Sequence, residues 1–198
     1  MGEHDTEQSS LEQLQAGDPA AFEALVRERG PRLRSVARRL LGNDVDTDEV
    51  LQEAFLAAFR GIGKFKGSSG LGTWLHRIVI NTALMRLRSR TTSEEELPAD
   101  LMPAFLEGGA FRNAQAAWQG GPHRDAVRAE TGCVVRGCID QLPDTARTAV
   151  VLRDLEGLSN EELGQQLGIS ANAAKIRVHR GRQALRSLLE RAFEGYVG

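Results

Sequence analysis

The sequence has little of what β-sheet, secreted and membrane proteins depend on. Aromatic residues make up only 5% of its 198 residues, and long β-branched runs are scarce, which favours helices over sheets. No apolar stretch approaches the roughly 18 residues typical of a membrane span. The opening segment MGEHDTEQSS lacks the apolar core and cleavage site of a signal peptide. We therefore expect a cytoplasmic, helical protein without membrane insertion.

Metal-binding and catalytic patterns are also missing. Cys133 and Cys138 are five residues apart, so on a helix they lie on different faces and are not placed for a disulfide or a shared metal. The four histidines are scattered, and the glycine-rich stretch 61–72 lacks the GxxxxGKS or GxxxxGKT pattern of a phosphate-binding loop. We predict that the protein is not an enzyme and has no catalytic residue, metal, cofactor or small-molecule substrate.

Charge is unevenly distributed, although the net charge is only −2. The stretch 76–90 has four arginines and no acid, and 170–191 has six basic residues against one acid, Glu190. The stretch 44–53 has five acidic residues and no basic one. This pattern predicts contact with a polyanion in two places and with a basic partner in a third. Taken singly, each patch is also typical of a solvated helix face.

The first helical pattern covers 18–41. The Asp-Pro pair at 18–19 is typical of a helix start, because aspartate caps the free N–H groups and proline fits the first turn. The Gly-Pro pair at 30–31 should break or kink this run, and Gly42 should end it.

Two further helices are expected in the N-terminal half. One runs from about Asp46 to Arg60, with an apolar stripe at helical spacing. The glycine-rich loop 61–72 follows, and Thr73 is expected to cap a helix that ends in a cluster of arginines near residue 90.

The periodic pattern disappears between 91 and 128, which predicts a long irregular linker. Several large apolar side chains in this linker indicate that part of it docks on a surface. The sequence thus predicts an all-α fold of two small helical domains. The expected divisions are a polar N-terminal tail (1–17), a first domain (18–90), the linker (91–128) and a second domain (129–194).

The second domain has clear start and stop signals. Asp144 is expected to cap a helix that ends near Gly157. Ser159 and Glu162 have the spacing of a capping box, in which each side chain bonds the other residue's backbone N–H. A short helix, a tight turn at Gly168 and a long basic helix then have the spacing of a helix-turn-helix.

The long helix of this motif is expected to present a basic outward face. Gly164 is small where the two helices would cross, and Gly168 supplies the turn between them. Side chains near the start of such a helix reach base edges in the major groove, while later arginines lie near phosphates. The outward set is Asn172, Ala173, Lys175, Ile176, Arg177, His179, Arg180 and Arg182.

Both halves resemble one family. The stretch from QLPDTARTAVVLRDLEG to IRVHRGRQALRSLL is similar to the promoter −35-reading domain of the extracytoplasmic-function (ECF) sigma factors of bacteria. DEVLQE (48–53) and WLHRIVIN (74–81) resemble motifs of the family's −10-reading domain, which also binds core RNA polymerase. The two matches occur in the family's order and cover most of 18–192.

The resemblance implies a role for each matched segment. The acidic helix is expected to bind the clamp helices of core RNA polymerase, since an acidic, partly apolar face suits a basic coiled-coil partner. The glycine-rich loop and the helix after it are expected to capture a flipped base of the −10 element. Trp74 is equally consistent with a core position. The core-binding set is Asp48, Glu49, Gln52, Glu53 and Leu56; the −10 set is Lys64, Lys66, Ser68, Ser69, Trp74, Arg77, Asn81, Arg86 and Arg88.

The −35 set comprises Ser170 together with the eight outward residues of the helix-turn-helix. Five positions depart from the family's pattern: Glu49 stands where aspartate is usual, Met85 stands where aspartate is frequent, Ala173-Ala174 replaces a common Thr-Val pair, and Ile176 replaces a small polar residue. Ala173 and Ile176 are therefore expected to make apolar contacts, for instance with thymine methyl groups.

The resemblance also implies partners and a mode of regulation. It predicts a sigma factor that binds core RNA polymerase and promoter DNA, serves a stress or envelope response, and is held inactive by an anti-sigma factor. The alternative from the residues alone is a stand-alone helix-turn-helix regulator, which would need a sensor or dimerisation domain in place of 18–90. A degenerate sigma-like module that binds polymerase without DNA is disfavoured by the basic helix.

Overall fold

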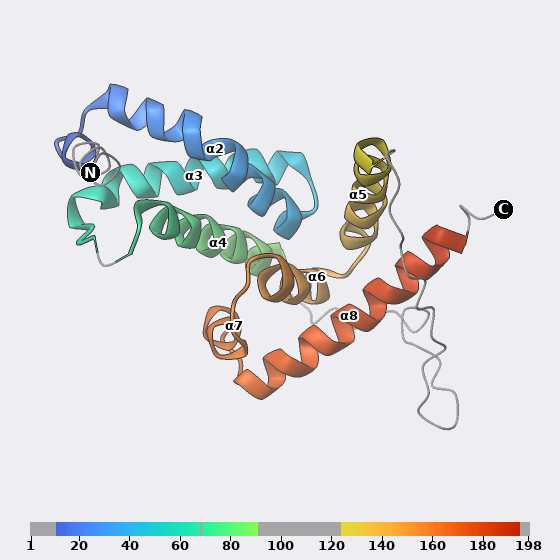
Figure 1. Cartoon of the computed structure of the whole chain (residues 1–198). Coiled ribbons are helices and arrows are strands. Elements are labelled where there is room, and N and C mark those ends of the chain that lie inside the picture. The colour runs from blue at the N-terminus through green and yellow to red at the C-terminus, as the bar shows by residue number, and fades with distance from the viewer. Residues whose placement is uncertain (1–10, 68, 91–123, 195–198) are drawn as a thin grey trace. The chain divides into compact units, whose positions relative to one another are not determined.

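The computed structural model describes residues 11–67, 69–90 and 124–194, which are helices and connecting turns with no strand among them (Figure 1). The all-α prediction is confirmed. The chain divides between residues 92 and 93 into two compact units, unit 1 (1–92) and unit 2 (93–198). The expected linker falls largely on residues outside the described ranges, including its large apolar side chains. None of the described helices is both long and apolar enough to cross a membrane.

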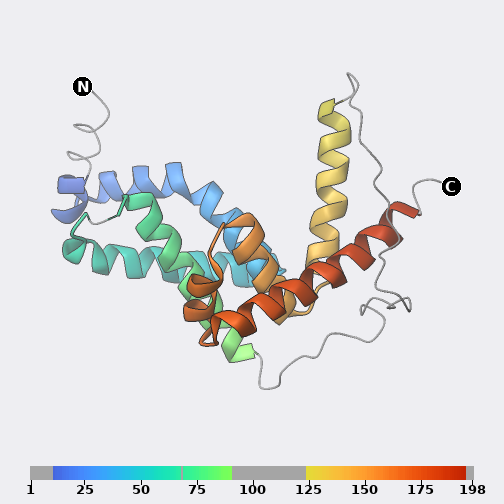
Figure 2. The same cartoon turned by 60° about the horizontal axis from the view of Figure 1, so that its bottom comes forward.

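Unit 1 is built from three long helices. They are α2 (Pro19–Leu41), α3 (Asp44–Gly61) and α4 (Leu71–Arg90), with a short 3-10 turn, η1 (Ile62–Lys64), after α3. Each long helix packs against the other two, as Figures 1 and 2 show from two directions. Because each contributes one apolar stripe, the stripes meet in a single core. Its buried members include Leu25, Leu33, Val36, Leu40, Val50, Ala54, Leu75, Val79, Ala83 and Leu84.

Helix α2 starts and stops as predicted but is not broken in the middle. Asp18 Oδ1 accepts a hydrogen bond from the Ala20 N–H at 2.9 Å, and Gly42 ends the helix with φ 74°. Pro31 lies inside a continuous helix, so the predicted break is wrong. Residues on both sides of it, such as Leu25 and Leu33, are buried in the same core, and this packing offsets the roughly 3 kcal/mol that an interior proline costs.

The starts of α3 and α4 also differ from the prediction. Helix α3 begins at Asp44, because Asn43 Oδ1 caps it by accepting from the Asp46 N–H at 2.9 Å. Helix α4 begins at Leu71, so Thr73 lies inside it and the predicted cap at Thr73 is wrong. The Trp74 N–H donates to the Gly70 carbonyl at 3.1 Å, which places the helix start in the glycine-rich loop itself.

Part of the segment expected to be a polar tail packs on unit 1. Residues 11–15 are helical, and Leu14 is only 2% exposed. Gln15 Nε2 donates to the carbonyls of Ile62 at 3.5 Å and Phe65 at 3.0 Å. Two leucines in a polar sequence, Leu11 and Leu14, gave no clear sign of this burial, which depends on a surface formed about fifty residues later.

Unit 2 contains α5 (Arg124–Asp140), α6 (Asp144–Val150), the π-helical turn η3 (Val151–Leu155), α7 (Asn160–Leu167) and α8 (Ala171–Glu194). Helix α8 contacts α5, α6 and α7. The cluster that joins α5, α6 and α8 consists of Cys138, Leu142, Ala146, Ala184 and Leu188. The long helix α8 is therefore the common support of the unit.

The prediction that Asp144 caps helix α6 is wrong. Pro143 occupies the cap position and Asp144 is the first helical residue. The Asp144 carboxylate accepts instead from Arg147, which is 5% exposed and donates to the carbonyls of Asp140 at 3.3 Å and Leu142 at 3.1 Å. A buried guanidinium needs such partners, so the aspartate is used to neutralise Arg147.

The turn between α7 and α8 follows the sequence signals closely. Ser159 and Glu162 form the capping box, and Gly168 ends α7 with φ 71°. Ser170 Oγ accepts from the Ala173 N–H at 3.1 Å at the start of α8. A Cβ on Gly164 would lie 2.8 Å from the Ile169 carbonyl oxygen, so only glycine fits where the turn folds back on α7.

The two cysteines occupy different environments, as their spacing predicted. Cys133 is exposed and Cys138 is buried, and both are free thiols. Burial raises the pKa of the Cys138 thiol, because an apolar surrounding disfavours the thiolate. Cys138 therefore serves as a small apolar side chain of the cluster around α8.

Gly164→Ala should destabilise the helix-turn-helix by roughly 1 to 3 kcal/mol, because the methyl group would press on backbone atoms that have no room to move. Gly137→Ala is the matched control: nothing lies within 4 Å of its Cβ position in helix α5, so alanine should stabilise that helix by about 0.5 to 1 kcal/mol. Hydrogen-exchange mass spectrometry on the full chain would report both. Equal protection of α7 and α8 in Gly164→Ala and the original protein would contradict the close approach.

Candidate functional site

The acidic start of α3 is paired on one side with arginines of α2. Arg34 Nη2 lies 2.9 Å from Asp44 Oδ1 and its Nε lies 3.0 Å from Asp48 Oδ1, while Arg38 Nε lies 3.6 Å from Asp44. The hydrogen bonds to Asp48 and Asp44 raise the pKa of Arg34. The two aspartate side chains are each 64% exposed, so these pairs are weak individually.

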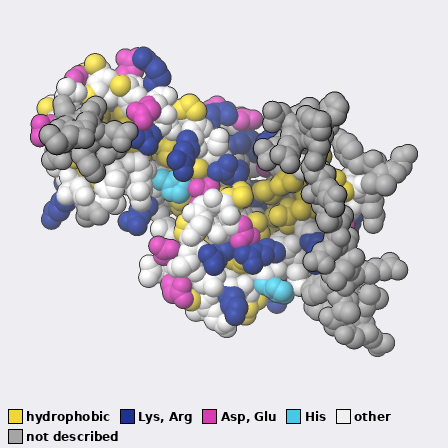
Figure 3. Space-filling model, viewed as in Figure 1, with side chains coloured by type: hydrophobic (Ala, Val, Ile, Leu, Met, Phe, Trp, Pro, Cys, Tyr) yellow, Lys and Arg dark blue, Asp and Glu magenta, His cyan; other side chains and the backbone are white. Residues whose placement is uncertain are grey.

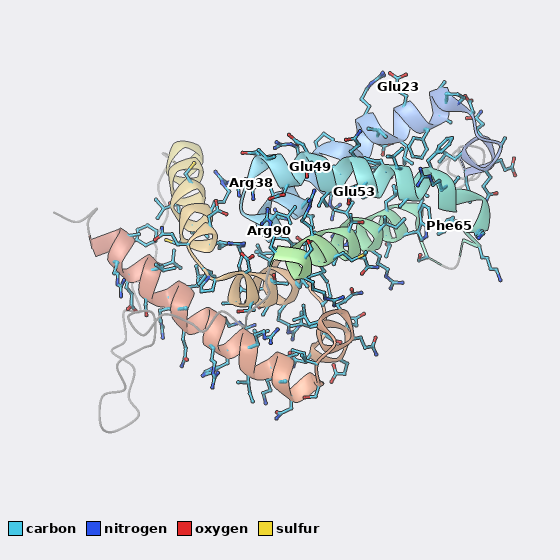
Figure 4. All side chains as sticks on the ribbon, turned by 180° about the vertical axis from the view of Figure 1, so that it is seen from behind. Glu23, Arg38, Glu49, Glu53, Phe65 and Arg90 are labelled. Atoms are coloured by element: carbon cyan, nitrogen blue, oxygen red, sulfur yellow. The ribbon has the colours of Figure 1, made fainter. Side chains whose placement is uncertain are left out.

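On its other side the same segment is paired with the end of α4. Asp46 contacts Arg86, with a separation of 3.7 Å from its Nε, and also forms an ion pair with Arg90. Glu49 forms an ion pair with Arg86. Arg90 Nη1 additionally donates to the Leu41 carbonyl at the end of α2, at 3.3 Å. Figure 4 shows Arg38, Glu49 and Arg90 gathered toward one end of unit 1.

These contacts bring together two sets of residues that the sequence assigned to different partners. Glu49 was expected to bind polymerase and Arg86 to bind promoter DNA, yet in this structure they pair with each other. The charge runs along the sequence could not show this, because the two residues are 37 positions apart. Most of the acidic patch is therefore balanced within unit 1.

An exposed stripe remains on the outer face of α3. Gln52, Glu53 and Leu56 are exposed, and Glu53 has no ion pair with another residue of the described ranges (Figure 4). Val45 lies on the same face at helical spacing and is 72% exposed, beside Leu56 at 48%. Sequence analysis missed Val45, although its position one helical turn before Glu49 was the available signal.

The glycine-rich loop is anchored at its start by aromatic side chains. The rings of Phe65 and Trp74 have centroids 5.1 Å apart, and a Cβ on Gly61 would be 3.4 Å from the Trp74 ring. Trp74 is half-buried, so it covers the loop and is not a core residue. Lys64 and Lys66 are exposed, Ser69 is half-buried, and Ser68 lies outside the described residues.

The outer face of α4 continues from this loop. Trp74, Arg77, Asn81 and Arg88 recur at helical spacing on one side of the helix, and all but Trp74 are exposed. Met85, one of the departures from the family's pattern, lies on this face and is 67% exposed. This face combines an aromatic ring, an amide, a thioether and cationic groups, which suits stacking and backbone contacts to single-stranded nucleic acid.

The outer face of α8 carries most of the predicted −35 set. Asn172, Lys175, Ile176, His179 and Arg180 are exposed, and Ala173 and Arg177 are half-buried. In the space-filling view, basic side chains lie over the first part of α8 and acidic ones over α7 (Figure 3).

Two members of the −35 set are engaged within unit 2. Ser170 caps α8 through its hydroxyl. Arg182 donates through both Nε and Nη2 to Asp154, with the Nε bond at 2.9 Å, and these bonds raise the pKa of Arg182. The pair ties α8 to η3, so Arg182 is already partnered where a phosphate contact was expected.

Both units are similar to regions of known proteins. Residues 25–92 match the family model "Sigma-70 region 2", and 134–185 match "Sigma-70, region 4". The chain is 32% identical to the RNA polymerase sigma-H factor of Pseudomonas aeruginosa, covering 93% of this chain and 94% of that protein. It is also 32% identical to the ECF RNA polymerase sigma-E factor of Escherichia coli, covering 93% and 95%. The solved structure of CnrH in complex with the cytosolic domain of CnrY is 26% identical, with TM-score 0.52, over 93% of this chain and 97% of that one.

Asp46→Asn should lower the free energy of unfolding of unit 1 by roughly 1 to 3 kcal/mol, because it weakens charge-assisted bonds that join α3 to Arg86 and Arg90. The Asp46 side chain is 20% exposed, so solvent replaces these bonds poorly. Asp48→Asn is the matched control, since that side chain is 64% exposed and should cost no more than about 1 kcal/mol. Urea denaturation, together with hydrogen exchange of α4, would compare the two variants. Equal losses of unfolding free energy would show that Asp46 does not join α3 to α4 in the way proposed.

Proposed function

The chain belongs to the ECF sigma factors, and we propose that it binds core RNA polymerase and directs it to particular promoters. The observation that carries this function is the presence of both sigma regions in order, each on a separate helical unit with an exposed face. It acts by binding and not by catalysis, and it works in the cytoplasm, where polymerase is. The proposed division of labour gives polymerase and the −10 element to 18–90, the −35 element to 129–194, and the connection to 91–128.

The exposed stripe of α3 is the proposed polymerase-docking surface. Gln52, Glu53 and Leu56 offer a carboxylate and an apolar side chain on one helical face, which fits a basic coiled coil with an apolar seam. Val45 is exposed on the same face of α3 and adds a second apolar side chain to this surface. Asp48 and Glu49 border it and are already held by Arg34 and Arg86, so their direct share in docking is expected to be smaller.

The loop after η1 and the outer face of α4 are the proposed −10 surface. Trp74 and Asn81 offer stacking and hydrogen bonding, and Lys64, Lys66 and Arg77 are exposed cations for the sugar-phosphate backbone. Capture of one base outside the stack requires a surface that can close around it. We expect the glycines of the loop to supply the conformational freedom and Trp74 to supply a fixed aromatic surface. Arg86 reaches a phosphate only by giving up Glu49 or Asp46.

The start of α8 is the proposed −35 surface. Asn172, Lys175 and Ile176 are exposed within its first two turns, where a recognition helix meets base edges. Ile176 is 46% exposed and has no polar atom, so its contribution is contact with a thymine methyl group. Arg177, which is half-buried, and Arg180, which is exposed, are the proposed phosphate contacts.

A protein inhibitor is also part of the proposal. CnrH, similar in sequence and fold, was solved in complex with the cytosolic domain of CnrY. We expect this chain to be held by an anti-sigma factor, and a stress or envelope signal to release it. The alternative, a stand-alone helix-turn-helix regulator, is disfavoured because 25–92 matches sigma region 2 in place of a sensor domain.

Glu53→Lys should reduce run-off transcription from the promoter of the protein's own operon by about tenfold or more at limiting core polymerase, because it places a cation opposite a basic partner. Raising the core concentration should restore the transcript, since the defect is in affinity. Glu23→Lys makes the same charge change on α2 (Figure 4). It loses an ion pair with Arg27 whose two side chains are 77% and 71% exposed, and such a pair contributes little, so this variant should transcribe normally. Glu53 is a cleaner probe than Glu49, whose reversal would also repel Arg86. Undiminished core binding by Glu53→Lys would reject this docking surface.

Ile176→Ser should remove sensitivity to one methyl group of the −35 element. Replacing each thymine in turn by deoxyuridine deletes only that methyl, and the original protein should lose about fourfold in affinity at one position, from the roughly 0.8 kcal/mol of a buried methyl-sized group. The Ile176→Ser protein should bind both DNAs equally at that position. Holoenzyme binding to duplex promoter fragments measures this. Lys175→Ser, a neighbouring exposed change, should weaken binding to the thymine and deoxyuridine DNAs equally and keep the fourfold difference between them, because the polar end of lysine does not recognise a thymine methyl group.

A further inference from the structure

Gln15 connects the N-terminal segment to the start of the glycine-rich loop. Its Nε2 donates to the carbonyls of Ile62 at 3.5 Å and Phe65 at 3.0 Å, across 47 and 50 residues of chain. Two carbonyls at opposite ends of η1 are thus held by one amide. Nothing in the assigned sigma surfaces uses this residue, which precedes the matched region 2 (25–92).

The Gln15 contact adds to other contacts that hold the loop's first turn. The Phe65 N–H donates to the Ile62 carbonyl at 3.0 Å, and the Phe65 ring lies on Trp74 from α4. Backbone, aromatic and amide contacts therefore fix Phe65 from three elements: η1, α4 and the helical segment 11–15. Lys64 and Lys66 remain exposed on either side of it.

The side chain of Gln15 is not needed for the helical segment 11–15 to fold. Leu14 supplies the burial, at 2% exposed, whereas Gln15 is an exposed residue whose bond to Phe65 faces solvent. A neutral hydrogen bond exposed to water adds little to global stability. Its effect is to select one orientation of the loop's first turn.

We propose that Gln15 is a positioning residue for capture of the flipped −10 base: it holds residues 62–65 against Trp74, so that the surface that receives the base is ordered before DNA binds. The inference rests on the proposed −10 function of this loop. A surface that is already ordered binds DNA more tightly, because the conformational entropy of the loop is not lost during binding. Loss of Gln15 therefore weakens recognition of one base and leaves polymerase binding unchanged.

The test compares Gln15→Met with Gln13→Met in the holoenzyme. Methionine keeps an unbranched chain and helix propensity but has no donor, and Gln13 is an exposed neighbour without a side-chain bond in the described ranges. Binding is measured to single-stranded −10 oligonucleotides that carry an abasic site at each position in turn. Gln15→Lys restores a donor of similar reach and is the rescue variant.

The original holoenzyme should lose affinity sharply at the abasic position of the captured base. Gln15→Met should bind the intact strand about fivefold more weakly and lose most of the penalty at that position only, while Gln13→Met behaves as the original and Gln15→Lys recovers. If the original protein shows the penalty and Gln15→Met keeps all of it, the inference fails and the −10 function stands. If no abasic position affects the original protein, base capture by the loop fails, and the inference with it.

Discussion

Unit 1 depends on one partly buried carboxylate. Asp46 accepts from Asn43 at the start of α3 and pairs with Arg86 and Arg90 near the end of α4. Arg90 in turn donates to the last residue of α2, Leu41. The ends of the three long helices are therefore joined at a single point. Apolar stripes alone allow helices to slide and rotate, whereas these charged bonds fix how far each helix extends past its neighbours.

That junction determines which charges remain available to partners. Arginines of α2 and α4 flank the acidic start of α3, so Asp44, Asp46, Asp48 and Glu49 are balanced before any partner binds. The free carboxylate of the proposed docking face is then Glu53, one turn further along. In the same way Asp154 engages Arg182 in unit 2, so the proposed −35 surface is confined to the first turns of α8.

The Glu49–Arg86 pair also joins the edges of the proposed polymerase face and the proposed promoter face. Both residues sit at the edges of their surfaces and share one ion pair. A partner that competes for either residue changes the surroundings of the other, since the pair is only partly exposed. The loop at the opposite end of unit 1 is far from this junction (Figure 4) and is held by aromatic and amide contacts, so the two ends are stabilised by different physical means.

Much of this protein was determined by the sequence alone. Helical periodicity, the Asp18 cap, the capping box at Ser159 and the glycines at 42, 164 and 168 predicted the helices and the helix-turn-helix, because these signals act between residues a few positions apart. The family motifs identified both sigma regions. Local signals failed where packing overrides them: α2 continues through Pro31, and α4 begins before Thr73.

Only the tertiary structure decided which polar side chains are free. Arg86 and Arg182 read as DNA contacts in the sequence but are paired with Glu49 and Asp154 from distant helices. Gln15 read as part of a polar tail but bonds the loop after α3. The reason is physical. Helix periodicity shows which residues face outward. The partner of an outward charge depends on which helix end lies beside it, and this is fixed only when the helices within each unit pack together.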